Sequence, residues 1–465
     1  MPERSRAALA LASCAVAAGA VLLGGHVTAL EDDSGVMTAE NTSGQMRSLS
    51  TRGVFDLDNP FFQDLGTNGR RCVTCHQPAE GWTITPEGVR ARFELSDGAD
   101  PIFRNNDGSN CEGAVPVTRV EQEHAYSLLL ERGLIRIGLD VPAGAEFAID
   151  SVADPYACAP ATNDVSFYRR PLPTANVSFL SAVMWDGRES QAGSAIRQDL
   201  AHQANTATRG HAASTRDLSA EEVNGIVDFE IHLFAAQAHD NVAGNLQTHG
   251  ARGGPRALSR QPFFIGINDP VGLNPTGAPF DPSVFTLFDP WADLHDGRDV
   301  ITAARRAVAR GQALFNARTF IISAVAGLNR ETFANGVTVP PSFTGTCTVC
   351  HDAPNVGNHS VKAPLDIGLS DPKVARYLPV YTVRSLMTGE TIGTTDLGRA
   401  MITGKWLDVG TFKGPVLRGL AARAPYFHNG AAATLEDAVD FYNTRFAIGL
   451  TAREKADLVA FLRTL

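Results

Sequence analysis

One short motif occurs twice in this chain and constrains its fold more than any other feature. It reads Cys72-Val-Thr-Cys75-His76 near the start and Cys347-Thr-Val-Cys350-His351 towards the end. Two cysteines at this spacing can both form thioether bonds to the vinyl groups of one haem, and the histidine that follows then faces the iron. With 7 cysteines and 12 histidines in the chain, chance gives roughly 0.003 such motifs. We therefore predict two covalently bound c-type haems, with His76 and His351 as iron ligands.

The alternative for each motif is a redox-active dithiol or half of a zinc site. A structural zinc site needs four ligands, and no second pair of cysteines lies close to either motif in the sequence. The haem interpretation is therefore favoured for both motifs.

Length and composition indicate a globular protein with room for two or three domains. Hydrophobic residues make up 44% of the 465 residues and charged residues 19%, which is typical of a folded chain. The net charge of −10 argues against a nucleic-acid partner and suits the docking of a basic redox protein.

The first 29 residues have the pattern of an export signal. Arg4 and Arg6 precede an apolar stretch at 7–23, and the small residues at 27–29 offer a cleavage site. Cys14 also fits a lipoprotein box, and an uncleaved anchor is a further alternative, although this stretch barely spans a bilayer. A cleaved signal suits c-type haem, which is attached outside the cytoplasm. We expect a periplasmic protein with no stable membrane insertion.

Two further cysteines, Cys111 and Cys158, belong to neither motif. In an oxidising compartment they could form a disulfide, and two free buried thiols are the alternative. Both lie in residues 80–170, which lack clear helical periodicity and contain strand-like runs at 133–149. We interpret 80–170 as an insertion that carries a small β element.

Helical patterns occur in five places, and two of them begin with a Ser/Thr-x-x-Glu capping box. The capping pairs are Ser219 with Glu222 and Thr451 with Glu454. The polar residues 30–50 are predicted as a flexible N-terminus of the mature protein. Residues 250–297 are predicted as a long ordered loop or second insertion. The predicted helices span residues 191–204, 219–237, 300–315, 434–442 and 451–465.

The two haem motifs, together with two further segments, resemble the bacterial di-haem cytochrome c peroxidase and MauG family. The further segments are Trp185-Asp-Gly-Arg188 and, near the end, Arg423-Ala-Pro-Tyr-Phe-His428-Asn-Gly. The resemblance does not extend to the insertions at about 80–170 and 250–297. It covers roughly residues 50–80, 170–240 and 298–465.

The resemblance implies a mainly α fold of two cytochrome c-type haem domains, with long loop-rich insertions that carry a little β. The N-terminal haem domain, at 30–297, is expected to hold the peroxide site. The C-terminal cytochrome c domain, at 298–465, is expected to hold the electron-transfer haem.

The family also implies a second axial ligand for the C-terminal haem, fourteen residues beyond the histidine of the Pro-Tyr-Phe-His segment. This ligand is methionine in the classical peroxidases and tyrosine in the MauG branch, and here the position is Tyr442. A phenolate is a hard anionic donor that lowers the haem potential, where methionine raises it. Met401 is the rival ligand, and a buried core aromatic is a further alternative for Tyr442.

Trp185 resembles the tryptophan that lies between the two haems of the family and relays electrons. An indole can be oxidised, which suits it to that role. A buried structural tryptophan is the alternative.

The family's distal glutamate, which moves protons during cleavage of the peroxide bond, falls near Asn205 in this chain. Gln198, His202 and Gln203 are nearby polar candidates for the same role. The chain has no histidine between His76 and His124, so an open or weakly ligated first iron is expected. His124 or His202 folding back onto this iron is the alternative.

The family's calcium site uses an asparagine shortly before the Trp-Asp-Gly-Arg segment and carbonyl groups near the Pro-Tyr-Phe-His segment. Arg170 and Arg423 fall at or near these positions. Cations there disfavour a bound calcium ion, and we leave calcium open.

The leading hypothesis is a periplasmic di-haem c oxidoreductase of the peroxidase/MauG type. Hydrogen peroxide would be reduced at the N-terminal haem, with electrons passed through the C-terminal haem. A small redox protein, or a protein or organic substrate, would supply the electrons. The alternatives are a di-haem oxygenase related to rubber oxygenases and a non-catalytic di-haem electron carrier. An open first haem argues against a carrier, since carriers are usually six-coordinate.

Overall fold

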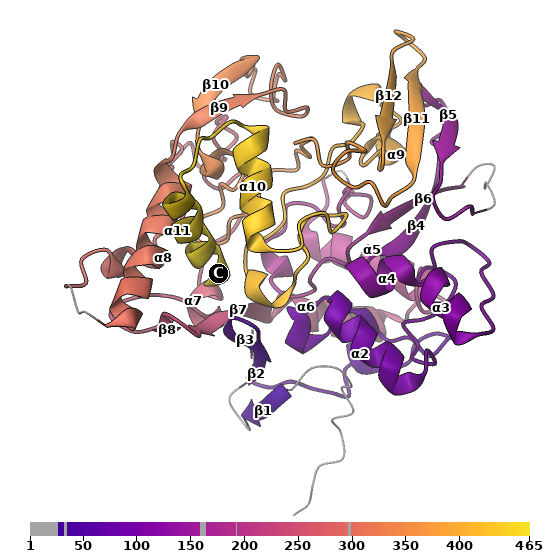
Figure 1. The fold of residues 1–465 in the computed structure, drawn as a ribbon, viewed down its shortest axis with the longest axis horizontal. Helices are drawn as coiled ribbons and strands as arrows, with labels where there is room; N and C mark the ends of the chain where they lie inside the picture. The colour runs from indigo at the N-terminus through magenta and orange to yellow at the C-terminus, as the bar shows by residue number, and fades with distance from the viewer. Residues whose placement is uncertain (1–26, 32–34, 159–163, 192, 296–298) are drawn as a thin grey trace, which may run out of the picture.

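The computed structural model describes residues 27–31, 35–158, 164–191, 193–295 and 299–465 (Figure 1). Most of the predicted export signal, with its lipoprotein box, falls on residues 1–26 and lies outside the described residues. Within the described part, eleven α-helices combine with twelve strands in four small sheets. No helix of this part has the length and apolar character needed to cross a membrane. The fold is helix-rich as predicted, but it contains more strand than the expected little β.

The helices and strands lie in all parts of the described chain. The α-helices are α1 (Cys72–Cys75), α2 (Pro86–Ser96), α3 (Arg119–Ala125), α4 (Ser127–Arg132), α5 (Ile196–Gly210), α6 (Ala220–Ile231), α7 (Pro255–Leu258), α8 (Val300–Ala317), α9 (Ala400–Thr403), α10 (Leu435–Arg445) and α11 (Ala452–Arg463). The strands are β1 (Val27–Glu31), β2 (Val36–Asn41), β3 (Gly44–Ser50), β4 (Ile135–Asp140), β5 (Phe147–Ala153), β6 (Asp164–Arg169), β7 (Leu233–Asp240), β8 (Gly244–Asn245), β9 (Phe320–Ser323), β10 (Ser342–Gly345), β11 (Val380–Ser385) and β12 (Thr391–Thr394).

The polar segment near the N-terminus is part of a sheet and not a flexible tail. β2 and β3 form an antiparallel hairpin, and β3 also pairs with β7, so that the strand order is β1-β2-β3-β7-β8. The first residues of β3 alternate between buried and half-buried, which is the period of two expected for a strand. The prediction for residues 30–50 is wrong because the partner strand β7 lies far along the chain, and strand formation depends on that partner.

The helix predicted over 219–237 ends at Ile231, and the chain continues directly as β7. Its capping box is confirmed: the Glu222 N–H donates to Ser219 Oγ at 3.2 Å, and the Ser219 N–H donates to the Glu222 carboxylate at 2.7 Å. The run that forms β7 begins with four apolar residues and is almost entirely buried, so its pattern fits a helix as well as a strand. α5 is also displaced from its prediction, because it begins at Ile196 and ends at Gly210.

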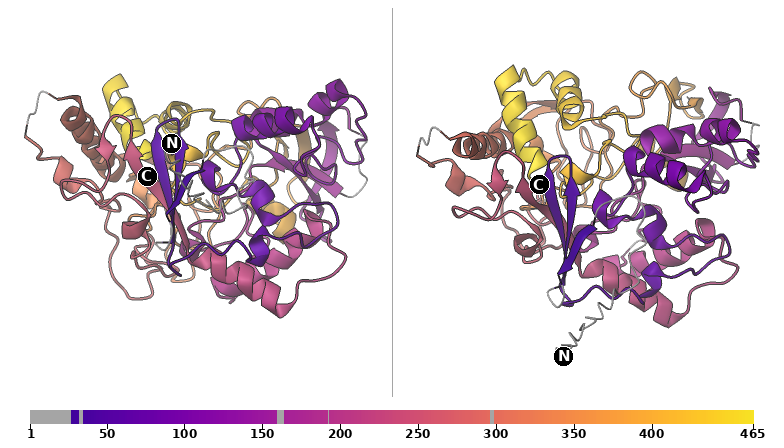
Figure 2. Two further views of the ribbon diagram at one scale, coloured as in Figure 1. Left: turned by 90° about the horizontal axis from the view of Figure 1, so that it is seen from below. Right: turned by 60° about the horizontal axis from the view of Figure 1, so that its bottom comes forward.

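The C-terminal helices agree with the prediction, and α8 packs against α11. Gly311 of α8 allows the close approach, because a Cβ atom there would lie 1.9 Å from the Asp457 carbonyl oxygen. Phe285, from the long loop, joins Phe315 and Phe461 in this core, with ring centroids 5.3 and 5.2 Å away. The chain's C-terminus lies beside the N-terminal strands (Figure 2).

The insertion at 80–170 carries the predicted small β element. β4 pairs with β6, and β5 pairs with β11, which comes from much later in the chain. The predicted disulfide between Cys111 and Cys158 is confirmed. The insertion is therefore closed by a covalent bond and attached to the C-terminal part of the chain by strand pairing.

Replacing Cys111 and Cys158 together by serine should lower the free energy of unfolding. For a sequence separation of 47 residues, loop-closure entropy in the unfolded chain puts the loss at about 2–4 kcal/mol. Urea unfolding of the oxidised protein measures it. Dithiothreitol should bring the wild type to the stability of the variant and leave the variant unchanged. Equal stability of both proteins without reductant would contradict the prediction.

Candidate functional site

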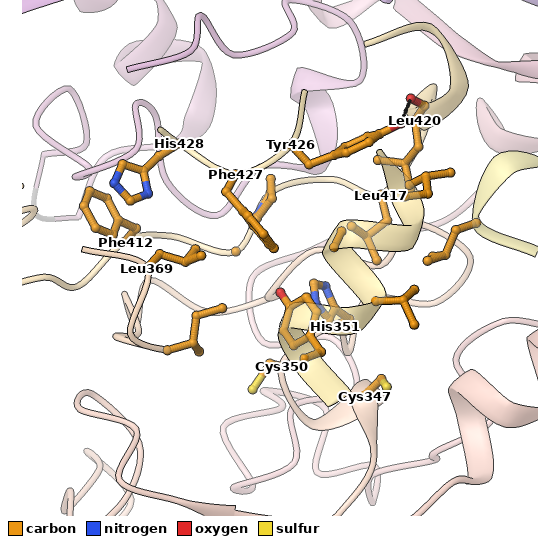
Figure 3. Close-up of a pocket in the computed structure, with 18 of the residues that line it drawn as sticks. Cys347, Cys350, His351, Leu369, Phe412, Leu417, Leu420, Tyr426, Phe427 and His428 are labelled. Atoms are coloured by element: carbon orange, nitrogen blue, oxygen red, sulfur yellow. Dashed lines mark hydrogen bonds between the residues drawn. The ribbon is translucent and has the colours of Figure 1, made fainter. Parts of the chain in front are cut away.

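Each Cys-x-x-Cys-His motif forms part of the wall of a large, mainly apolar cavity. The first cavity, of about 150 Å³, is lined by the motif at residues 72–76, and the second, of about 210 Å³, by the motif at residues 347–351. In the second cavity the two cysteine sulfurs lie near the His351 ring, and Leu417 and Leu420 lie further along the wall (Figure 3). Both cavities thus combine thiols and an imidazole with apolar walls, as a porphyrin requires.

The two motif histidines are oriented by backbone carbonyl groups. Nδ1 of His76 donates to the Trp82 carbonyl oxygen at 3.1 Å, and Nδ1 of His351 donates to the Gly357 carbonyl oxygen at 2.6 Å. Burial lowers the pKa of His76 to about 4, so its ring is neutral. In each motif Nε2 is the nitrogen left for a metal, and neutral imidazole with a bonded second nitrogen is the form in which histidine binds metals.

The motif cysteines are held as neutral thiols. Burial raises the pKa of Cys72, Cys347 and Cys350 to about 12. Redox dithiols and zinc sites use thiolates with a lowered pKa. Among the described residues, no group of three or more histidine, cysteine or carboxylate side chains is arranged to hold a metal ion. The surroundings of the thiols therefore fit thioether attachment better than either alternative.

Of the two rival ligands, Tyr442 lies in the second cavity and Met401 does not. Tyr442 lines this cavity together with His351, and its hydroxyl has no hydrogen-bond partner within the described chain. Burial raises the pKa of the Tyr442 phenol above its usual value. Met401 is buried in a separate cluster with Phe147 and Tyr381. α10 therefore brings the hydroxyl of Tyr442, and not a thioether, to the cavity of His351.

Of the four polar residues expected near the first haem, Gln203 lines the first cavity and the other three do not. The Gln198 side chain accepts the Ala195 N–H at 3.0 Å and caps α5. His202 is 53% exposed and bonds Glu189. Asn205 accepts the Leu218 N–H at 2.8 Å. Their bonds fix the ends and outer surface of α5.

Gln203 shares the wall of the first cavity with polar residues that the sequence did not single out. Among these are an imidazole, a carboxyl group and a guanidinium, from His211, Glu230 and Arg188.

Glu230 is a buried carboxyl group that the sequence analysis missed. One of its oxygens accepts the Thr174 hydroxyl at 2.5 Å, and the other has no hydrogen-bond partner among the residues that the structure describes. Burial raises the pKa of Glu230 to about 7. Glu230 follows buried Ile226 by four residues on α6, and a carboxylate on the apolar face of a predicted helix is a signal that could have found it.

Trp185 lies where the two cavities adjoin. Its indole N–H donates to the Arg170 carbonyl oxygen at 2.8 Å, and its ring centroid is 6.1 Å from that of His428. Five residues line both cavities and so form the wall between them, which we call the seam: Arg170, Pro171, Pro173, Trp185 and Lys413.

The guanidinium group of Arg170 fills a cluster of carbonyl oxygens at the seam. The side chain is buried, and this burial lowers its pKa to about 10, so the group stays charged. A cation surrounded by carbonyl oxygens is what a calcium site provides, and here an arginine of the chain itself supplies the charge. A calcium ion does not fit this cluster. The accepting carbonyl groups belong to Ile84 (2.6 Å), Arg132 (3.1 Å), Arg423 (3.1 Å), Gly133 (3.5 Å) and Ala424 (3.5 Å).

Comparison with known proteins finds relatives for part of the chain, although no family model matches it. The cytochrome-c peroxidase IdrP2 of Denitromonas iodatirespirans is 36% identical over 137 residues, covering 26% of this chain and 37% of that protein. The cytochrome c551 peroxidase of Nitrosomonas europaea is 35% identical over 128 residues, covering 26% and 31%. The chain thus spans about a third of the length of these relatives. The resemblance to bacterial cytochrome c peroxidases is confirmed for the matched part.

Two solved structures were also compared with this fold. A MauG-like protein associated with microbial copper homeostasis gives a TM-score of 0.33 at 18% identity, covering 66% of this chain and 76% of that one. A di-haem peroxidase from Burkholderia thailandensis gives 0.31 at 16% identity, covering 87% and 83%.

Replacing Arg170 by methionine should destabilise the protein by about 2–5 kcal/mol, because several buried carbonyl groups lose their donor. Urea unfolding measures this loss. Arg216→Met is the matched control, since that arginine is 55% exposed in its ion pair with Glu222 and should contribute less than about 1 kcal/mol. A calcium chelator should leave the Tm of the wild type unchanged. A lower Tm in the chelator would mean that calcium is bound after all.

Proposed function

We propose that this chain is a periplasmic di-haem c oxidoreductase that reduces hydrogen peroxide. The observation that carries the proposal is the adjoining pair of cavities, each with a Cys-x-x-Cys-His motif in its wall and with Trp185 in the seam. The names of the partial relatives support the peroxidase class.

Each cavity has the groups that would hold a c-type haem. Thioether bonds would come from the motif cysteines at 72, 75, 347 and 350, and axial bonds from Nε2 of His76 and His351. When bound, such a haem supplies a redox-active iron that can take a peroxide. Guanidinium groups at the wall suit the haem propionates, since arginine pairs well with carboxylates. In the first cavity these are the side chains of Arg71 and Arg188.

The polar groups that line the two cavities differ, which supports different roles for the two haem sites. The second cavity offers Tyr442 as a second ligand to the haem of His351. A haem with two protein ligands suits electron transfer, and a tyrosine ligand lowers its potential. The first cavity offers polar groups such as Gln203 and His211, which suit a small polar substrate. We therefore assign peroxide reduction to the first cavity and electron transfer to the second.

The seam would carry electrons between the two sites. Trp185 belongs to the walls of both cavities, and its indole is held by a hydrogen bond to a backbone carbonyl group. A fixed, oxidisable ring between the two sites is suited to relay an electron. We retain the expected division into an N-terminal part at 30–297 and a C-terminal part at 298–465. A small redox protein or an organic substrate would supply the electrons at the surface.

The proposed function is tested by mixing the purified diferric protein with hydrogen peroxide in a stopped-flow spectrometer. The wild type should react without prior reduction of either haem. In the Tyr442→Phe variant, one haem should lose its tyrosine ligand and its midpoint potential should rise, as measured by a redox titration. A reaction that requires one haem to be reduced first would mean that a protein ligand blocks the first iron. No reaction in either state would favour an oxygenase or an electron carrier.

Replacing Trp185 by phenylalanine should slow oxidation of the second haem after peroxide binds at the first. We expect at least a tenfold loss, equivalent to about 1.4 kcal/mol in the barrier, because the ring in the seam becomes harder to oxidise. Stopped-flow spectra at the two haem bands measure the rate. Trp406→Phe is the control, since Trp406 packs against a cluster outside both cavities. An unchanged rate in the Trp185 variant would exclude this residue as the relay.

A further inference from the structure

One wall of the first cavity is a single face of α5. Gln203, Ala207 and His211 line the cavity, and their spacing of four residues places them on one side of the helix. His211 follows the last residue of α5, and its backbone N–H bonds the Ala207 carbonyl oxygen. The small side chain of Ala207 lies between the amide and the imidazole, which leaves room for a small ligand between them.

The His211 ring is fixed by a buried ion pair. Its Nδ1 bonds one carboxylate oxygen of Asp107, and the other oxygen of Asp107 bonds Arg70. The side chains of Arg70 and Asp107 are only 3% and 8% exposed. Burial alone would raise the pKa of Asp107, but the neighbouring His211 and Arg70 side chains hold it below its usual value, so the carboxylate is ionised and accepts hydrogen bonds. Nε2 of His211 is therefore the nitrogen available to the cavity.

We propose that His211 is the acid–base residue of the first cavity and that Asp107 and Arg70 are its positioning residues. This inference rests on the proposed reduction of hydrogen peroxide. Nε2 of His211 would take one proton from hydrogen peroxide and return it to the oxygen atom that leaves as water. A haem held by His76 would supply the electrons for breaking the O–O bond, and the redox donor would replace them. Over one turnover, hydrogen peroxide, two electrons from the redox donor and two protons give two water molecules.

Other residues of the cavity fit this role less well. Gln203 has an amide, which does not accept a proton at neutral pH. The carboxyl group of Glu230 accepts the Thr174 hydroxyl at 2.5 Å and is held by no ion pair within the part of the chain that the structure describes. A histidine held by a carboxylate through Nδ1 is the usual arrangement for a general base.

The test uses the purified diferric holoprotein and two stopped-flow rates, for the binding of cyanide and for the reaction with hydrogen peroxide. Hydrogen cyanide must lose a proton as it binds, so its rate reports the base independently of peroxidase activity. His211→Gln and His211→Ala should slow both rates by about 100-fold or more. His232→Gln is the matched control and should change neither. His232 also follows the last residue of its helix, α6, and lies beside an aspartate, but it lines neither cavity.

Each outcome of this test decides between the assignments. Unchanged rates in both His211 variants, or slower rates in Glu230→Gln instead, would overturn the assignment of His211. A change of the ferric spectrum from low spin to high spin in the His211 variants would overturn it too, because His211 would then be an iron ligand. If cyanide binding depends on His211 but the wild type does not react with peroxide, His211 stands as the proton acceptor and the proposed function fails.

Discussion

The buried guanidinium of Arg170 is the interaction on which the arrangement of the two cavities depends. It donates to carbonyl groups near residues 84, 132 and 423, which belong to three segments far apart in the sequence. The N–H of Arg170 also bonds the His428 carbonyl oxygen at 2.7 Å, and its own carbonyl oxygen accepts the Trp185 indole. One residue therefore ties the walls of both cavities to the tryptophan between them. The positive charge in this position belongs to a side chain, so it cannot dissociate as a bound metal ion can.

The backbone of Trp185 is held as firmly as its ring. Its carbonyl oxygen accepts the Lys413 N–H at 2.9 Å, and the Lys413 ammonium group donates to the Ala182 carbonyl oxygen at 2.9 Å. Burial lowers the pKa of Lys413 to about 7, because a charged group loses hydration when it is buried. Holding the Lys413 ammonium group in the seam therefore costs free energy. Groups buried at such a cost keep a fixed geometry, because every alternative leaves a polar atom without a partner.

The sequence predicted those features whose cause is local. The haem motifs, the caps at Ser219 and Thr451, and the helix that carries Tyr442 all depend on neighbouring residues. The hairpin β2–β3 and the end of α6 depend on β7, which only the folded chain brings alongside. His211 and Glu230 of the first cavity were missed for a related reason. Counting along the chain does not tell which face of α5 meets the cavity, and the folded chain places the face with Gln203 and His211 there.

Burial of Tyr442 also determines which oxidation state of a haem the second cavity would favour. Burial raises the pKa of the Tyr442 phenol and so stabilises its neutral form. A phenolate there requires a compensating positive charge, since no cationic side chain contributes to the shifted pKa of Tyr442. A ferric haem on His351 would supply more of this charge than a ferrous one. If Tyr442 is the ligand, the cavity therefore favours the oxidised haem, and the low polarity of its walls strengthens that preference.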